Sequence, residues 1–219
     1  MRIKLVIFDL DQTLIDTLPR FFKVFNKTLK KYGLREVEWD IFLEKYKADD
    51  LDSLISPRVL LDDFWNTFLE IYDEEPPLND RAIEGAEETL SCLRKSGVKI
   101  VVVTGRKSPK EKVWENLRLY GLDKYVDAVF TASSVQDLEF RFSKKELLIK
   151  VIRDYGVSEK EVMFVGDYRY DMLSGKKAGV FTVGVLTGHE SEEVLFSYGA
   201  DLVVESVASI PEVLEKLKR

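Results

Sequence analysis

Polar side chains follow three apolar runs of this sequence, at 3–8, 98–103 and 161–165. These side chains are Asp9, Asp11, Thr104, Asp167 and Asp171. If the runs are parallel strands of one open sheet, the crevice beyond their carboxyl ends brings all of these groups together. We therefore expect one site that is rich in carboxylates.

Four carboxylates in one crevice repel each other, because two unit charges about 4 Å apart cost roughly 4 kcal/mol at an effective dielectric near 20. A cation is expected among them. The crevice offers oxygen ligands, whereas Cys92 is distant in the sequence and His189, in the loop "TGHE", is expected to be exposed. The sequence therefore predicts Mg²⁺, which prefers carboxylate and carbonyl oxygen and often accompanies phosphate-bearing substrates.

The residue types and their spacing suit phosphoryl transfer. A carboxylate can attack phosphorus and form an aspartyl-phosphate if a metal screens its charge. A second carboxyl group nearby can protonate the departing alkoxide and then deprotonate the water that releases phosphate. Two acids separated by one residue, Asp9 and Asp11, meet that need. Thr104 and a lysine at a helix start can donate hydrogen bonds to the transferred group.

Composition limits the classes of partner and compartment. The 219 residues include 45% hydrophobic and 33% charged residues, which is typical of a globular protein. A net charge of −6 leaves no basic field for nucleic acid, and no apolar run approaches the ~18 residues of a membrane span. The single cysteine, Cys92, excludes an internal disulfide and is expected to be a buried thiol. We expect a cytoplasmic protein without a signal peptide or membrane anchor.

Short apolar runs alternate with helical stretches, which predicts an α/β fold with a Rossmann-like parallel sheet and helices on both faces. The expected strands are 3–8, 98–103, 128–131, 161–165, 181–186 and 201–204. Three serines are expected at helix starts. Ser108 is the expected N-cap of "SPKE" at 108–111, "SKKE" at 143–146 places Lys144 in a first turn, and Ser56 precedes Pro57 at a third start.

One connection is too long for a single crossover helix. Roughly ninety residues separate the first strand from the second, and 17–81 has helical periodicity and many aromatic side chains. We expect 17–81 to form a small helical cap inserted into a core made of 1–16 and 82–219. Its aromatic residues are expected to form the core of this insert.

Four segments resemble the motifs of the haloacid dehalogenase superfamily, in order and at suitable spacing. They are "DLDQT" at 9–13, "VVVTG" at 101–105, Lys144 and "GDYRYD" at 166–171. The likeness spans nearly the whole chain, and the insert after the first motif resembles the cap of the phosphoglycolate-phosphatase-like branch. The resemblance implies a Mg²⁺-dependent phosphatase acting on a small phosphorylated metabolite.

The resemblance also implies a role for each matching residue. It implies Asp9 as nucleophile, Asp11 as general acid/base, Thr104, Gly105 and Lys144 as phosphate-binding residues, Mg²⁺ held by Asp9, Asp167 and the backbone carbonyl of Asp11, and Asp171 in support. Two positions depart from the pattern. Gln12 stands where many relatives have glycine, and the third motif lacks the Lys-Pro pair; Lys144 fits better than Lys145, because it lies twelve residues before Gly156.

Three other functions remain open at this point. A haloacid dehalogenase is disfavoured by Asp11, because a halide leaving group needs no proton. A sugar phosphomutase is compatible with the same residues. A phospho-accepting signalling receiver is disfavoured by Asp11 and by the insert. The substrate, the cap residues that set specificity, and the choice between monomer and homodimer stay undetermined by the sequence.

Overall fold

The computed structural model describes residues 2–57, 59–135 and 143–218. Its contacts divide the chain into two compact units. The α/β unit takes the residues up to Ile15 together with those from Ala82 onward, and the helical unit takes Asp16–Arg81.

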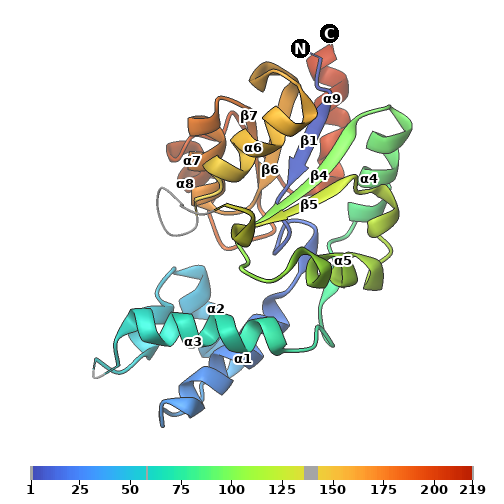
Figure 1. Cartoon of the computed structure of the whole chain (residues 1–219). Helices are drawn as coiled ribbons and strands as arrows, with labels where there is room; N and C mark the ends of the chain where they lie inside the picture. The colour runs from blue at the N-terminus through green and yellow to red at the C-terminus, as the bar shows by residue number, and fades with distance from the viewer. Residues whose placement is uncertain (1, 58, 136–142, 219) are drawn as a thin grey trace. The chain divides into compact units, whose positions relative to one another are not determined.

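The α/β unit is built on a six-stranded parallel sheet with the order β5-β4-β1-β6-β7-β8 (Figure 1). The strands are β1 (Leu5–Phe8), β4 (Lys99–Thr104), β5 (Ala128–Thr131), β6 (Val162–Gly166), β7 (Phe181–Val185) and β8 (Leu202–Val204). Each expected strand forms, with its ends shifted by two residues at most. The predicted α/β fold with a parallel sheet is confirmed.

Helices cover both faces of this sheet because its central strands are apolar on both sides. Val6 and Phe8 of β1 belong to one hydrophobic cluster, whereas Leu5 and Ile7 belong to another. The first cluster includes α4 (Ala86–Lys95), α5 (Lys110–Leu119) and α9 (Ile210–Lys218). The second includes α6 (Lys145–Tyr155) and α7 (Arg169–Ala178), and α8 (Glu192–Ser197) packs against α7 and β7. Alternate side chains of β1 therefore pack against helices on opposite faces of the sheet.

The strand order reverses beside β1. From β1 the chain passes to β4 and β5 on one side, and β6, β7 and β8 extend the sheet on the other side. In such an open sheet the ligand crevice lies at this reversal, outside the carboxyl ends of the strands. Phe8 at the end of β1 is in register with Val165 of β6, so the residues that follow these two strands emerge side by side.

The helical unit has a core of its own. It contains α1 (Leu18–Lys31), α2 (Trp39–Lys47) and α3 (Leu61–Glu74). At the two chain connections between the units, the short strands β2 (Ile15–Asp16) and β3 (Arg81–Ala82) form a separate two-stranded sheet. Phe25, Phe42 and Phe64 are fully buried, and the ring centroid of Phe25 lies 5.7 Å from that of Phe42 and 5.5 Å from that of Phe64. The aromatic residues of this segment thus pack on one another, as expected.

The expected helix starts are displaced. The first helical residue of α5 is Lys110, because Pro109 is the N-cap residue and adopts an extended ψ of 141°. Ser56 accepts a hydrogen bond from Val59 N in a turn, so α3 starts only at Leu61.

The predicted start of α6 is wrong by one residue. Lys144 is the N-cap residue, outside the first turn, with a φ of −115° and a ψ of 2°, and its backbone N–H donates to Ser174 Oγ of α7 at 3.0 Å. This contact with a neighbouring helix is invisible to a local sequence pattern.

The prediction for Cys92 is wrong, because this thiol is exposed. The buried face of α4 is formed by Ala86, Thr89, Leu90 and Leu93, and Cys92 falls outside this helical spacing. In the described part of the chain, we find no helix with the length and apolar character that a membrane crossing requires.

Candidate active site

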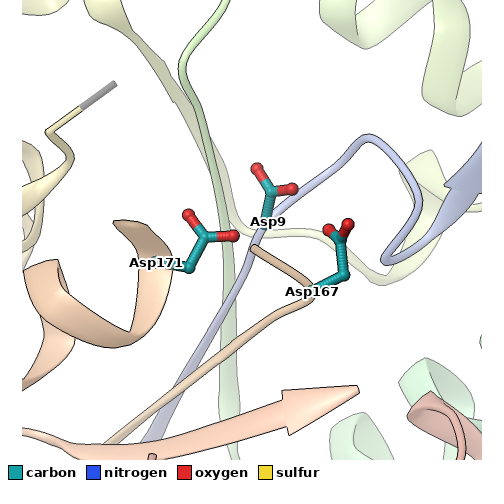
Figure 2. A group of neighbouring side chains, drawn as sticks. All are labelled: Asp9, Asp167 and Asp171. Atoms are coloured by element: carbon teal, nitrogen blue, oxygen red, sulfur yellow. The ribbon is translucent and has the colours of Figure 1, made fainter. Parts of the chain in front are cut away.

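Asp9 and Asp167 lie at the carboxyl ends of two neighbouring strands. Asp9 directly follows β1, and its backbone N–H donates to Val165 O of β6 at 2.8 Å. Asp167 directly follows β6, and Asp171 lies in the first turn of α7. Figure 2 shows these three side chains gathered where the three segments meet. The parallel pairing of β1 with β6 is what brings residues so distant in sequence together.

The three aspartates form a buried acidic cluster. Each offers one carboxylate oxygen, and these atoms all lie within 4.8 Å of one another. Asp9 and Asp167 are each 5% exposed, and Asp171 is 1% exposed. Carboxylate oxygens at such short separations are the donor set of a hard cation.

Lys144 enters this cluster from the start of α6. Its Nζ lies 2.6 Å from Asp9 Oδ1 and 2.5 Å from Asp171 Oδ1. The side chain of Lys144 is only 8% exposed, so both contacts are charge-assisted hydrogen bonds in a buried setting. Lys145 is the first residue of α6 and is half-buried. The structure brings Lys144 to the acidic cluster.

Burial sets the pKa values of this cluster. Desolvation raises the pKa of Asp9 to about 7, and the negative charges of Asp171 and Asp11 add to that rise, although Lys144 opposes it. Desolvation, with the charges of Asp9 and Asp171, also raises the pKa of Asp167 well above its ordinary value. Burial disfavours the ammonium form of Lys144, but Asp171 and Asp9 outweigh burial and raise its pKa. Three carboxyl groups therefore share the single positive charge of Lys144, and burial disfavours the ionised forms of Asp9 and Asp167.

Two glycines allow the backbone to approach the carboxylates closely. A Cβ atom on Gly188 would lie 2.1 Å from Asp167 Oδ2, and one on Gly166 would lie 2.5 Å from Asp171 Oδ2. The other oxygen of Asp167, Oδ1, accepts from Thr13 Oγ1 at 2.9 Å. These contacts fix the orientation of Asp167 and Asp171.

Thr104 and Gly105 lie at the end of β4, against Lys144. Thr104 is 1% exposed, and its Oγ1 accepts from Arg106 N at 3.2 Å. A Cβ atom on Gly105 would be 3.7 Å from Lys144 Cε, so this backbone segment passes beside the lysine stem. The end of β4 therefore reaches the same crevice as the ends of β1 and β6.

Asp11 has a different partner from the three clustered aspartates. Its carboxylate is bound by Arg106, with Nε 2.8 Å from Oδ2 and Nη2 2.5 Å from Oδ1. The backbone around Asp11 turns sharply, and the next residue, Gln12, has a φ of +59°. This left-handed conformation favours glycine, so Gln12 adopts a backbone conformation that is uncommon for a residue with a side chain.

Arg106 was missed by the sequence reasoning. It directly follows the Thr104–Gly105 pair, and this position next to a predicted strand end was the available signal. His189 was also misjudged, because its side chain is only 9% exposed and its Nε2 lies 3.7 Å from Glu190 Oε1. The ring of His189 packs against Tyr168, with 5.5 Å between centroids, which buries a loop residue expected to face solvent.

The arrangement combines the groups that phosphoryl transfer requires. A buried carboxylate contacts a lysine, further carboxylates suit a cation, and another carboxylate is held beside the end of β4. Donors such as Lys144 can bind the oxygen atoms of a transferred phosphoryl group.

Comparison with known proteins gives a consistent result. A family model described as haloacid dehalogenase-like hydrolase matches residues 6–185. Pyrophosphatase PpaX from Halalkalibacterium halodurans is 28% identical over 98% of this chain and 98% of its own length. A solved structure of a predicted phosphoglycolate phosphatase from Haemophilus somnus has a TM-score of 0.79, with 22% identity over 97% of this chain and 98% of that chain. A predicted phosphatase from Clostridium acetobutylicum has a TM-score of 0.80, with 20% identity over 99% and 100%.

Proposed function

This chain belongs to the haloacid dehalogenase-like hydrolase family, and we propose that it is a Mg²⁺-dependent phosphatase that hydrolyses a small phosphomonoester. The reaction proceeds through an aspartyl-phosphate on Asp9. The observation that carries this proposal is the buried cluster of Asp9, Asp167 and Asp171 with Lys144 bound inside it. If the ion pair between Lys144 and Asp9 only stabilised the fold, two further buried carboxylates that repel Asp9 would weaken that stabilisation.

The cluster fits a divalent cation. Within the described residues, the hydrogen bonds of Asp9 and Asp167 engage one carboxylate oxygen each, Oδ1, which leaves Oδ2 of both residues for a cation. Burial, together with the charges of neighbouring aspartates, raises the pKa values of both groups, and a bound cation would favour their ionised forms. Asp9, Asp167 and the backbone carbonyl of Asp11 are the proposed ligands. When bound, Mg²⁺ screens the negative charge between nucleophile and phosphate.

Each remaining residue has a proposed task. Lys144, Thr104 and Gly105 bind the oxygens of the phosphoryl group and orient it toward Asp9. Asp171 holds Lys144 in place through the contact of 2.5 Å. Asp11 gives a proton to the leaving oxygen and later takes one from the attacking water.

The presence of Asp11 favours a phosphatase over a dehalogenase, because a halide leaves without a proton. It also disfavours a phospho-accepting receiver, since a second acid hastens hydrolysis of the acyl-phosphate. A phosphomutase, which returns the phosphoryl group to a sugar, is distinguished by its product.

Inorganic diphosphate is a second candidate substrate. The relative from Halalkalibacterium halodurans is named as a pyrophosphatase. Phosphoglycolate remains a candidate by analogy with the solved structure that bears that name. We propose a small phosphorylated metabolite as the partner, with no nucleic acid or membrane partner, a cytoplasmic location, and a monomer or homodimer as the working form.

The test measures phosphate release from a panel of phosphorylated metabolites and from inorganic diphosphate, with Mg²⁺ and with a chelator. We expect Mg²⁺-dependent turnover by the wild type, and loss of at least about 10³-fold in Asp9→Asn, because the amide cannot attack phosphorus. The Asp154→Asn variant is the matched control. Asp154 is an exposed aspartate paired with Lys150 on α6, so its removal leaves activity unchanged.

Trapping of phosphoenzyme on the wild type, but not on Asp9→Asn, completes the assignment. Normal turnover by Asp9→Asn contradicts the assignment of the nucleophile. A folded wild type that releases no phosphate from any member of the panel contradicts the proposed function as a whole.

A further inference from the structure

The guanidinium group of Arg106 makes a bidentate contact with the carboxylate of Asp11. Both carboxylate oxygens of Asp11 are engaged, one by Nε at 2.8 Å and one by Nη2 at 2.5 Å. A planar guanidinium and a planar carboxylate joined in this way fix both the position and the plane of the carboxylate. The side chain of Asp11 is 31% exposed, so this contact holds a partly exposed carboxylate.

Arg106 is itself immobilised. Its backbone N–H donates to Thr104 Oγ1 at 3.2 Å, and its carbonyl accepts from Ala132 N at 2.9 Å. Its third guanidinium nitrogen, Nη1, donates to Asn116 Oδ1 at 3.0 Å. Asn116 lies on α5 and is 8% exposed, as Arg106 is 9% exposed. The contacts of Arg106 with Asn116 and with the backbone of the α/β unit therefore fix the orientation of Asp11.

We propose that Arg106 is a positioning residue for the leaving-group step, which orients Asp11 toward the departing oxygen and is itself oriented by Asn116. This inference rests on the proposed function. In the step, the bond between phosphorus and the ester oxygen breaks while a bond forms between phosphorus and Asp9. The electron pair of the broken bond stays on the ester oxygen, which takes the proton of Asp11.

The contacts of Arg106 leave room for that proton transfer, although the positive guanidinium favours the ionised form of Asp11. Each carboxylate oxygen has two lone-pair sites, and Arg106 occupies one site on each oxygen of Asp11. The side chain of Asp11 is 31% exposed. Proton transfer requires about 2.6–3.2 Å between heavy atoms, and a misplacement of about 1 Å can cost about 10²-fold in rate.

The decisive experiment compares leaving groups in the Arg106→Ala variant. We measure the first step alone, as the burst of released leaving group with Mg²⁺ present. For an alkyl phosphate, whose alkoxide needs a proton, we expect a loss of about 10²-fold. For 2,4-dinitrophenyl phosphate, whose leaving group is stable as an anion, we expect a change below about 3-fold. A residue that merely supports the fold would lower both rates by the same factor.

Two further variants test the same chain of contacts. Arg106→Lys keeps the positive charge but lacks the planar guanidinium. Its burst rate with the alkyl phosphate should therefore fall between the rates of the wild type and Arg106→Ala. Asn116→Ala should also lower the burst rate with the alkyl phosphate more than the rate with 2,4-dinitrophenyl phosphate, but by a smaller factor than Arg106→Ala. Arg94→Ala is the matched control, because Arg94 pairs with Asp127 at 3.2 Å in an exposed position on α4. It should change neither rate.

The outcomes separate this inference from the proposed function. Equal losses for both leaving groups, or no loss for either, in a folded Arg106→Ala variant overturn the positioning role while the wild type remains a phosphatase. A wild type that cleaves neither substrate overturns the proposed function, and the inference with it.

Discussion

The ammonium group of Lys144 is shared between two buried carboxylates, Asp9 and Asp171. A third carboxylate, Asp167, belongs to the same cluster, so one positive charge faces three potential negative charges. Burial raises the pKa values of Asp9 and Asp167, and these neighbouring carboxylates raise them further. A divalent cation would balance the remaining charge, which connects the arrangement of these residues to the proposed use of Mg²⁺.

Replacing Lys144 should therefore affect catalysis far more than replacing its neighbour. We expect Lys144→Ala to lower kcat/KM by about 10²-fold or more, because it removes a donor to the phosphoryl group and leaves Asp9 without its partner. Lys145→Ala is the matched control, since it deletes the same side chain one residue later, and should stay within about 3-fold of the wild type. Steady-state kinetics at saturating Mg²⁺ provide the measurement. A larger loss in Lys145→Ala would reverse this assignment.

The sequence alone could predict the groups that follow strand ends, but not the partner of Asp11. Asp9, Thr104 and Asp167 are each adjacent to an apolar strand, so their meeting follows from the parallel sheet. The contact of Arg106 with Asp11 depends on the path of the chain after Gly105. That path is set by the hydrogen bond from Ala132 N, a contact between segments that no local pattern contains.

Among the elements, strands were easier to predict than helix starts. A central parallel strand is buried on both faces, so its apolar run marks it almost completely, as in β4. A helix start depends on which of several neighbouring residues supplies the cap. At α6 the N-cap residue Lys144 donates its backbone N–H to Ser174 Oγ, and Ser174 is thirty residues away. The displacement of α6 by one residue places Lys144 at the N-cap position, before the first turn.

The loop after β7 should be sensitive to the smallest added side chain. In Gly188→Ala, the new Cβ would lie 2.1 Å from Asp167 Oδ2, so either the loop or the carboxylate must move. Because Asp167 is a proposed ligand, we expect the Mg²⁺ concentration for half-maximal activity to rise about 10-fold or more, as for changes around metal ligands in general. Titration of activity with Mg²⁺ measures this effect.

Gly97→Ala serves as the control for that prediction. Gly97 has a φ of +75° and nothing within 4 Å of an added Cβ, so alanine there strains the backbone without touching Asp167. It should lower the melting temperature and leave the Mg²⁺ requirement unchanged. If Gly188→Ala retains the wild-type Mg²⁺ requirement, the close approach of this loop has no bearing on cation binding.

At the scale of the whole molecule, the acidic cluster links stability to pH. In the absence of a cation, burial raises the pKa of Asp9 from 3.8 to about 7. Between these values the folded chain keeps a proton that the unfolded chain has released. Stability contributed by this group is therefore present at low pH and lost as the pH rises toward 7, at up to about 1.4 kcal/mol per pH unit for one proton. The raised pKa of Asp167 acts in the same direction.

This loss of stability with rising pH leads to a prediction for the free energy of unfolding. In a chelator, the stability of Asp9→Asn relative to the wild type should increase as the pH rises from about 4.5 to 7.5, since the amide never acquires the buried charge. Added Mg²⁺ should stabilise the wild type more at pH 7.5 than at pH 4.5, because protons compete with the cation for the same oxygens. Denaturant unfolding at each pH, with chelator or with Mg²⁺, gives both comparisons, and Asp154→Asn controls for the loss of an aspartate at an exposed site. A difference between Asp9→Asn and the wild type that shrinks with rising pH would mean that Asp9 is not the buried, charge-strained group described above.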